Sequence, residues 1–91
     1  MKWRWGEPVM MTVRILFFGP LRDHAGAGPE MMELPEGSTV AELREAVLGR
    51  WPALRVWESS LLVAVNLRYA VAGDPVPPGA EVAIMPPVQG G

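Results

Sequence analysis

Cysteine is absent from this chain of 91 residues, and histidine occurs once, at His24. Without cysteine the chain can form no disulfide, bind no metal through thiolate and use no thiol as a nucleophile. A structural zinc site takes about four ligands, and no suitable cluster surrounds His24 in the sequence. The sequence therefore predicts no metal site, and the lack of cysteine fits a reducing compartment.

Concentrated positive charge and long apolar segments are also missing. The net charge is −2, with no cluster of lysine and arginine, and Lys2 is the only lysine. Nucleic-acid binding usually requires a basic patch, so we predict no nucleic-acid partner. No apolar run approaches the roughly 20 residues of a membrane span. No apolar segment of a signal peptide follows Lys2 and Arg4, so we predict a cytoplasmic protein without membrane association.

What is present suits one small globular domain, because 49% of the residues are apolar and 20% are charged. We expect three parts: an N-terminal extension (1–10), a folded domain (11–85) and an extended tail (86–91). The first ten residues do not resemble the rest, and we expect them to be flexible. Alternatively, Trp3 and Trp5 lie on one face of an added strand.

Strand patterns occur along the whole of the predicted domain. Residues 12–18 are β-branched and aromatic, and Gly19-Pro20 ends them. Further strands are expected at 30–34, 61–65 and 81–85, with a short edge strand at 69–71. In the first strand, Leu16 and Phe18 share one face with Arg14, so this face meets either solvent or a partner. Coverage of both apolar residues within the chain is the alternative.

The clearest helix starts after Thr39, because Glu42 three residues later completes a capping box. Apolar residues from Val40 to Trp51 fall on one side at helical spacing, and Pro52 ends the helix. The element order is thus strand, strand, helix, strand, short strand, strand. One main helix on one face of a mixed sheet of four to five strands is an α+β design. With the first and last strands as parallel central neighbours, it is the β-grasp (ubiquitin-like) fold.

The chain ends in Gly90-Gly91, directly after the last strand and Pro86-Pro87. Proline restricts φ and favours an extended path, and two glycines form a thread without side chains. Such a thread delivers its terminal carboxylate, which is a poor acyl donor until it is activated. No glycine-rich phosphate-binding loop is present, so activation with ATP must come from a partner. The chain by itself is therefore predicted to be non-catalytic and to bind no cofactor.

Four segments resemble the small subunit of molybdopterin synthase, a ubiquitin-like sulfur-carrier family. They are Phe17-Phe18-Gly19-Pro20-Leu21-Arg22-Asp23, residues 34–43, Val63-Ala64-Val65-Asn66 with Tyr69, and the final strand and tail at 81–91. The resemblance covers 11–91. Its tail, Pro-Pro-Val, one residue and Gly-Gly, is its most specific part. The turn Pro78-Gly79-Ala80 departs from the acidic turn usual in the family but keeps the turn geometry.

The resemblance implies a mechanism centred on Gly91. An E1-like adenylyltransferase uses ATP to adenylate its carboxylate, and a sulfur donor converts the adenylate to a thiocarboxylate. The tail, comprising Pro86, Pro87, Val88, Gln89 and Gly90, then enters the large subunit. There the thiocarboxylate gives its sulfur to cyclic pyranopterin monophosphate, in molybdenum cofactor biosynthesis. The resemblance further implies a heterotetramer of two small and two large subunits.

Docking on the large subunit is expected to use Leu16 and Phe18, with Arg22 pairing with a partner carboxylate. The alternative for Arg22 is an ordinary solvated charge. A carrier for thiamin thiazole synthesis or tRNA thiolation, and a ubiquitin-like protein modifier, are the alternative functions.

Overall fold

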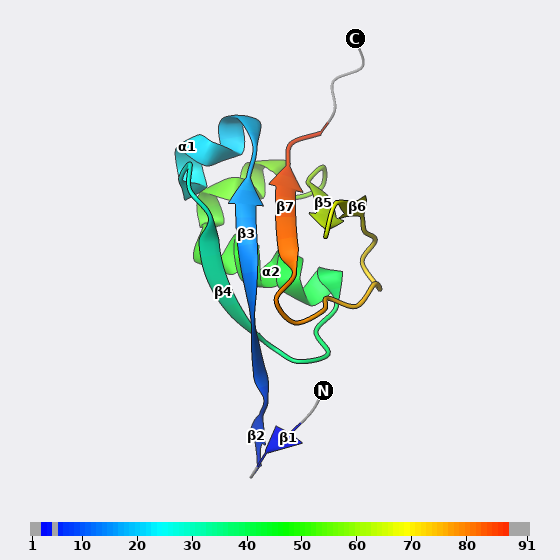
Figure 1. Ribbon diagram of the computed structural model, residues 1–91. Coiled ribbons are helices and arrows are strands. Elements are labelled where there is room, and N and C mark those ends of the chain that lie inside the picture. Colours follow the sequence, from blue (N-terminus) through cyan, green and yellow to red (C-terminus); the bar gives the residue numbers. More distant parts are fainter. Residues whose placement is uncertain (1–2, 5, 88–91) are drawn as a thin grey trace.

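The chain folds into two sheets and a set of helices, seen in a computed structural model that describes residues 3–4 and 6–87 (Figure 1). The strands are β1 (Trp3–Arg4), β2 (Glu7–Pro8), β3 (Met10–Phe17), β4 (Glu30–Pro35), β5 (Leu62–Val65), β6 (Arg68–Tyr69) and β7 (Glu81–Met85). The α-helices are α1 (Arg22–Ala25) and α2 (Val40–Arg50), and the 3-10 helices are η1 (Gly19–Leu21) and η2 (Pro52–Trp57).

The larger sheet has five strands in the order β4-β3-β7-β5-β6, and α2 crosses its rear face in Figure 1. Strands β3 and β7 are parallel central neighbours, whereas β3–β4, β7–β5 and β5–β6 are antiparallel. A mixed sheet covered on one face by one main helix is the predicted α+β, ubiquitin-like β-grasp fold. The prediction is confirmed, and the first and last strands of this sheet lie side by side at its centre.

Helix α2 begins where its capping box predicts. The Glu42 backbone N–H donates to Thr39 Oγ1 at 3.4 Å, and the Thr39 N–H donates to Glu42 Oε1 at 3.0 Å. Two otherwise unpaired donors at the helix start are thereby satisfied. Leu43 and Val47 are buried on the side facing the sheet, while Glu42 and Glu45 are exposed.

The core lies between α2 and the sheet, and alternation along the strands determines which side chains enter it. In β3, Val13, Ile15 and Phe17 are buried. In β7, Val82 and Ile84 are buried. Successive strand residues point to opposite faces, so the residues between these form the other, open face of the sheet.

Some element boundaries differ from the sequence prediction. Strand β3 starts at Met10 rather than residue 12, because its N-terminal half pairs with β4 as far as Pro35. It therefore crosses the predicted domain boundary at residue 10. Within the predicted extension, β1 pairs antiparallel with β2. The edge strand starts at Arg68 rather than Tyr69, since the preceding turn places Arg68 opposite Val65.

Helix length also bears on membrane association. In the part of the chain described, 3–4 and 6–87, no helix is long and apolar enough to cross a membrane.

Candidate functional site

The end of β7 determines where the C-terminal tail leaves the domain. This strand is hydrogen-bonded on both sides, to β3 and to β5, so its last residues are held at the centre of the sheet. Strand β3 runs in the same direction and ends beside it (Figure 1). The Phe18 N–H donates to the Ile84 carbonyl at 3.1 Å, which extends this pairing beyond β3. The tail therefore starts from a well-anchored point.

Gly19 lies against the first residue of the tail. Its φ is +60°, in the left-handed region that glycine adopts at little cost. A Cβ added there would lie 3.2 Å from Pro86 Cγ. The missing side chain thus lets Pro86 pack closely on the turn that follows β3. Sequence reasoning identified Gly19-Pro20 as the end of a strand but not as the support of the tail.

The predicted reactive residue lies outside the described residues. Pro86 and Pro87 are described and half-buried, so the tail begins along the domain surface. The remaining predicted tail residues, Val88, Gln89 and Gly90, and the reactive Gly91 lie beyond position 87. Their roles stay predictions.

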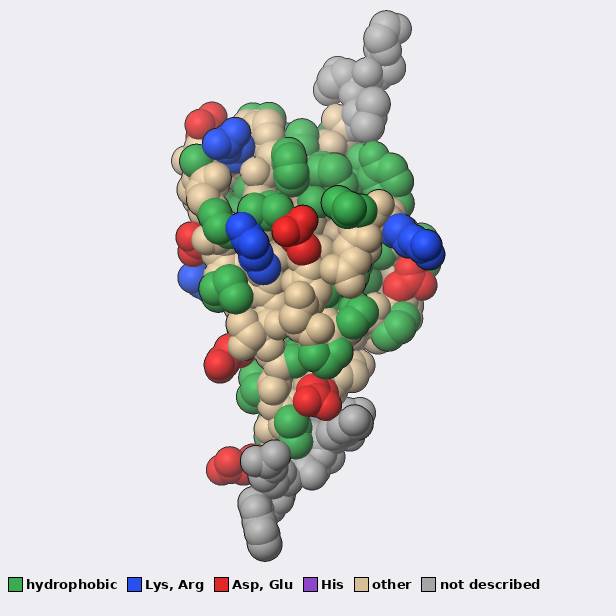
Figure 2. All heavy atoms as spheres, viewed as in Figure 1, with side chains coloured by type: hydrophobic (Ala, Val, Ile, Leu, Met, Phe, Trp, Pro, Cys, Tyr) green, Lys and Arg blue, Asp and Glu red, His purple; other side chains and the backbone are tan. Residues whose placement is uncertain are grey.

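An apolar hollow of about 280 Å³ lies on the open face of the sheet. Its lining, which we call the open-face patch, comprises Phe18, Ala64, Leu67, Tyr69, Glu81, Ala83 and Met85. Figure 2 shows hydrophobic side chains gathered on this face next to the end of β7. Phe18 is 46% exposed, Tyr69 73% and Leu67 90%. Large exposed apolar side chains grouped in this way are typical of a protein-binding surface.

The structure brings one of the predicted docking residues, Phe18, into this patch. Leu16 is half-buried on the same face of β3 and does not line the hollow. Arg22 is exposed at the start of α1, outside the patch. Phe18 is thus exposed and Leu16 partly exposed, and their role in docking stays a prediction.

Leu67 lies in a turn whose backbone angles favour glycine or asparagine over leucine. Asn66 and Leu67 have φ of +49° and +70° and join β5 to β6. Positive φ at both central positions of a two-residue hairpin turn is usually supplied by Asn-Gly. Leucine in the left-handed region costs roughly 1–2 kcal/mol. The turn thus presents an apolar side chain to solvent at an energetic cost, which is a common feature of functional sites.

Of the open-face patch, sequence reasoning predicted only Phe18 as a docking residue. The large apolar side chains that it missed are Leu67, Tyr69 and Met85. The alternation of Glu81, Ala83 and Met85 with buried residues in β7 was a usable signal for the open face. No local pattern indicated Leu67, because leucine has no preference for positive φ.

Comparisons with known proteins identify a family and individual proteins that are similar to this chain. Residues 15–91 match the ThiS family. A molybdopterin synthase sulfur carrier subunit from Caenorhabditis briggsae is 36% identical over 84 residues, covering 90% of this chain and 100% of that protein. Among solved structures, SAMP1 from Haloferax volcanii superposes with a TM-score of 0.75 at 28% identity, covering 88% of this chain and 99% of that one.

A further solved structure contains a complex. It is the complex of subunits 1 and 2 of the molybdopterin-converting factor from Helicobacter pylori. The matching chain has a TM-score of 0.61 at 28% identity and covers 89% of this chain and all of that one.

Proposed function

We propose that this chain, which belongs to the ThiS family, is the sulfur-carrying small subunit of molybdopterin synthase. One observation carries the proposal: the match to a sulfur carrier subunit of that enzyme covers 90% of this chain and 100% of that protein. The match to the ThiS family, at residues 15–91, includes the tail, where the chemistry of a carrier takes place. The similarity therefore extends beyond a shared fold to the segment that carries the chemistry.

Activation and sulfur loading take place at the carboxylate of Gly91. An E1-like adenylyltransferase joins this carboxylate to the AMP portion of ATP and releases pyrophosphate. A sulfur donor then displaces AMP, and the tail ends in a thiocarboxylate. The chain itself binds no cofactor in this scheme, and the ATP belongs to the activating partner. By itself it is non-catalytic, and it supplies sulfur to a sulfurtransferase complex.

Delivery of the sulfur uses the anchored tail and the open-face patch together. The patch docks on the large synthase subunit through Phe18, Tyr69 and Leu67, with Leu16 beside it. Arg22, outside the patch, pairs with a carboxylate of the partner. Gly19 supports Pro86 and thereby directs the tail from the docked domain into the partner. The thiocarboxylate sulfur then attacks cyclic pyranopterin monophosphate. The Helicobacter pylori complex of the two subunits supports a large-subunit partner.

The assembly and its location extend the same proposal. Two small and two large subunits form a heterotetramer, as the family resemblance implies. The protein works in the cytoplasm, and the absence of cysteine from the chain is compatible with this reducing compartment.

Removal of Gly91 tests the proposed function. The deletion variant should keep the circular dichroism spectrum and melting temperature of the wild type, because the residue follows the folded domain. It should lose both the exchange of oxygen for sulfur in intact mass spectra and the conversion of precursor with the large subunit. Sulfur transfer by the deletion variant would refute the role of the terminus.

A second variant pair tests docking. Phe18→Ser removes an apolar contact from the open-face patch, whereas Val56→Ser changes a side chain that is 81% exposed elsewhere. Only the first should weaken binding to the large subunit, measured by calorimetry. Equal affinities of the two variants would argue against this patch as the docking surface.

A protein modifier is the second candidate, because the chain is 28% identical to SAMP1, one of the archaeal modifier proteins. Intact mass analysis in the native host distinguishes the two functions. A modifier forms stable lysine adducts on other proteins, whereas a carrier gains one sulfur in place of oxygen. Thiolation of tRNA or synthesis of thiazole, without conversion of the pterin precursor, would instead assign the carrier to another pathway.

A further inference from the structure

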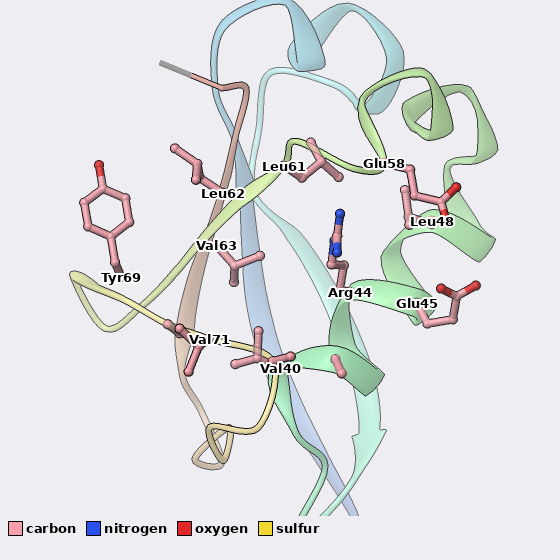
Figure 3. A pocket seen from close by; sticks show the side chains of 13 residues that line it. Val40, Arg44, Glu45, Leu48, Glu58, Leu61, Leu62, Val63, Tyr69 and Val71 are labelled. Atoms are coloured by element: carbon pink, nitrogen blue, oxygen red, sulfur yellow. The ribbon is translucent and has the colours of Figure 1, made fainter. Parts of the chain in front are cut away.

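A groove of about 530 Å³ separates α2 from the edge of the sheet at β5 and β6. Figure 3 shows it from close by, with α2 on one side and β5 on the other. Its volume falls within the ~300–1,000 Å³ range of ligand-binding pockets. We call it the helix–edge groove. Its apolar lining includes Val40, Leu48, Leu61, Val63 and Val71.

Arg44 projects from α2 into this apolar lining (Figure 3). Its Nε is buried and has no hydrogen-bond partner. Within residues 3–4 and 6–87, the Arg44 guanidinium forms neither an ion pair nor a hydrogen bond. Buried polar atoms without a partner are rare in folded proteins because desolvation is costly. The Arg44 guanidinium therefore lies unpaired in the lining of the groove.

The acidic residues of the lining are already paired with another cation. Arg55 donates to Glu45 at 3.0 Å and to Glu58 at 3.2 Å. The hydrogen bond to Glu45, followed by that to Glu58, raises the pKa of Arg55 above its ordinary value. One arginine thus holds both carboxylates, and Arg44 remains the unpaired charge of the groove. An anionic group would complement it.

The rim of the groove favours an extended occupant. Tyr69 is 73% exposed and Val71 is 69% exposed, and both line the groove. A pocket for a small metabolite usually encloses most of its ligand. Exposed apolar side chains at a rim are instead typical of contact with another polypeptide.

We propose that the helix–edge groove binds a peptide segment of a partner protein in which one Asp or Glu side chain is flanked by aliphatic residues. The carboxylate accepts charge-assisted hydrogen bonds from the guanidinium group of Arg44. The flanking aliphatic side chains pack on Leu48, Leu61 and Val71. Guanidinium groups suit this role because their planar array of donors matches a carboxylate.

The groove and the open-face patch lie on opposite faces of the sheet, and Tyr69 at the edge lines both. A partner on the open face therefore leaves most of the groove accessible. The carrier can hold an acidic peptide while its tail is engaged elsewhere. This inference rests on the groove alone and does not depend on the proposed sulfur chemistry.

The test uses two matched peptides, acetyl-Leu-Glu-Leu-Val-amide and its Gln counterpart, titrated into the full isotope-labelled chain and followed by NMR. The Glu peptide should shift the amide signals of the groove lining and bind at least about tenfold more tightly than the Gln peptide. Arg44→Gln should weaken binding of the Glu peptide by a similar factor, and Arg44→Lys should retain part of it. Arg68→Gln removes an exposed arginine that does not line the groove, and should have no effect.

Specific results would overturn the proposal. One is equal affinity for the two peptides, or an unchanged affinity in Arg44→Gln whose spectrum remains folded. Another is the absence of groove shifts at millimolar peptide. Binding of hexanoate as tight as that of the Glu peptide would assign the groove to a small carboxylate instead. In a double-mutant cycle, Arg44→Gln combined with the Gln peptide should weaken binding no more than either change does alone.

Discussion

At Gly19 the backbone angle and the packing both favour glycine. Its φ is +60°, and a Cβ would lie 3.2 Å from Pro86 Cγ. The first constraint is local, whereas the second joins residues far apart in the sequence. Together they let the turn after β3 support the first residue of the tail.

Gly19→Ala should therefore affect both stability and function. We expect a loss of about 1–2 kcal/mol in the free energy of unfolding, measured in urea, because a non-glycine residue is strained at this φ. Displacement of Pro86 should also slow sulfur transfer to the large subunit. Gly49→Ala is the control, because a Cβ at this position meets nothing within 4 Å. Alanine in place of glycine in a helix should raise the free energy of unfolding by about 0.5–1 kcal/mol. A Gly19→Ala variant as stable as the wild type would contradict the strain expected at this backbone angle, and unchanged sulfur transfer would contradict the support of Pro86.

At the scale of an element, the hairpin of β5 and β6 shows how backbone and side chain can favour different residues. The backbone of Leu67 favours glycine or asparagine, whereas its side chain extends the open-face patch. Because that side chain is 90% exposed, its removal should cost little core packing. The strain is then better explained by contact with a partner than by stability of the hairpin.

Leu67→Gly separates these two effects. Relief of strain is offset by the larger conformational freedom of glycine in the unfolded chain, so the free energy of unfolding should change by less than about 0.5–1 kcal/mol. Affinity for the large subunit, measured by calorimetry, should fall. Leu67→Asn, which also tolerates positive φ, should behave in the same way. A strong loss of stability with unchanged affinity would assign Leu67 a structural role.

For the whole molecule, β7 connects the core to the tail. Ile84 is 1% exposed and lies opposite Phe17 in β3 and Val63 in β5. The strand is therefore held by hydrogen bonds on both sides and by a buried side chain facing α2. Any loosening of this strand affects the fold and the tail's starting point together.

Ile84→Ala should lower the free energy of unfolding by about 2–5 kcal/mol, because it leaves a cavity between the sheet and the helix. For a domain of this size, each kcal/mol lowers the melting temperature by about 4–8 °C. Calorimetry should therefore record a decrease of about 10 °C or more. Val56→Ala, at a mostly exposed position, should stay within about 0.5 kcal/mol of wild type. Similar melting temperatures for the two variants would contradict a core centred on β7.

Patterns that act over a few residues were predictable. β-Branched and aromatic residues predicted β3, the capping box at Thr39 and Glu42 predicted α2, and the order of the elements predicted the β-grasp fold. Element ends were less predictable, because pairing with β4 extends β3 back to Met10. For the candidate site, Phe18 was found from alternation. Gly91 came from the terminus itself and stays a prediction.

By itself, the sequence determined the elements, the fold and a tail without side-chain chemistry of its own, because periodicity, capping and glycine content are local properties. Only the tertiary structure decided that Gly19 lies under Pro86, that Leu67 takes a left-handed backbone and that Arg44 enters an apolar groove unpaired. Each of these depends on segments brought together by folding. Their separation along the chain leaves no periodic signal, so the contacts become visible only once the sheet and α2 have packed.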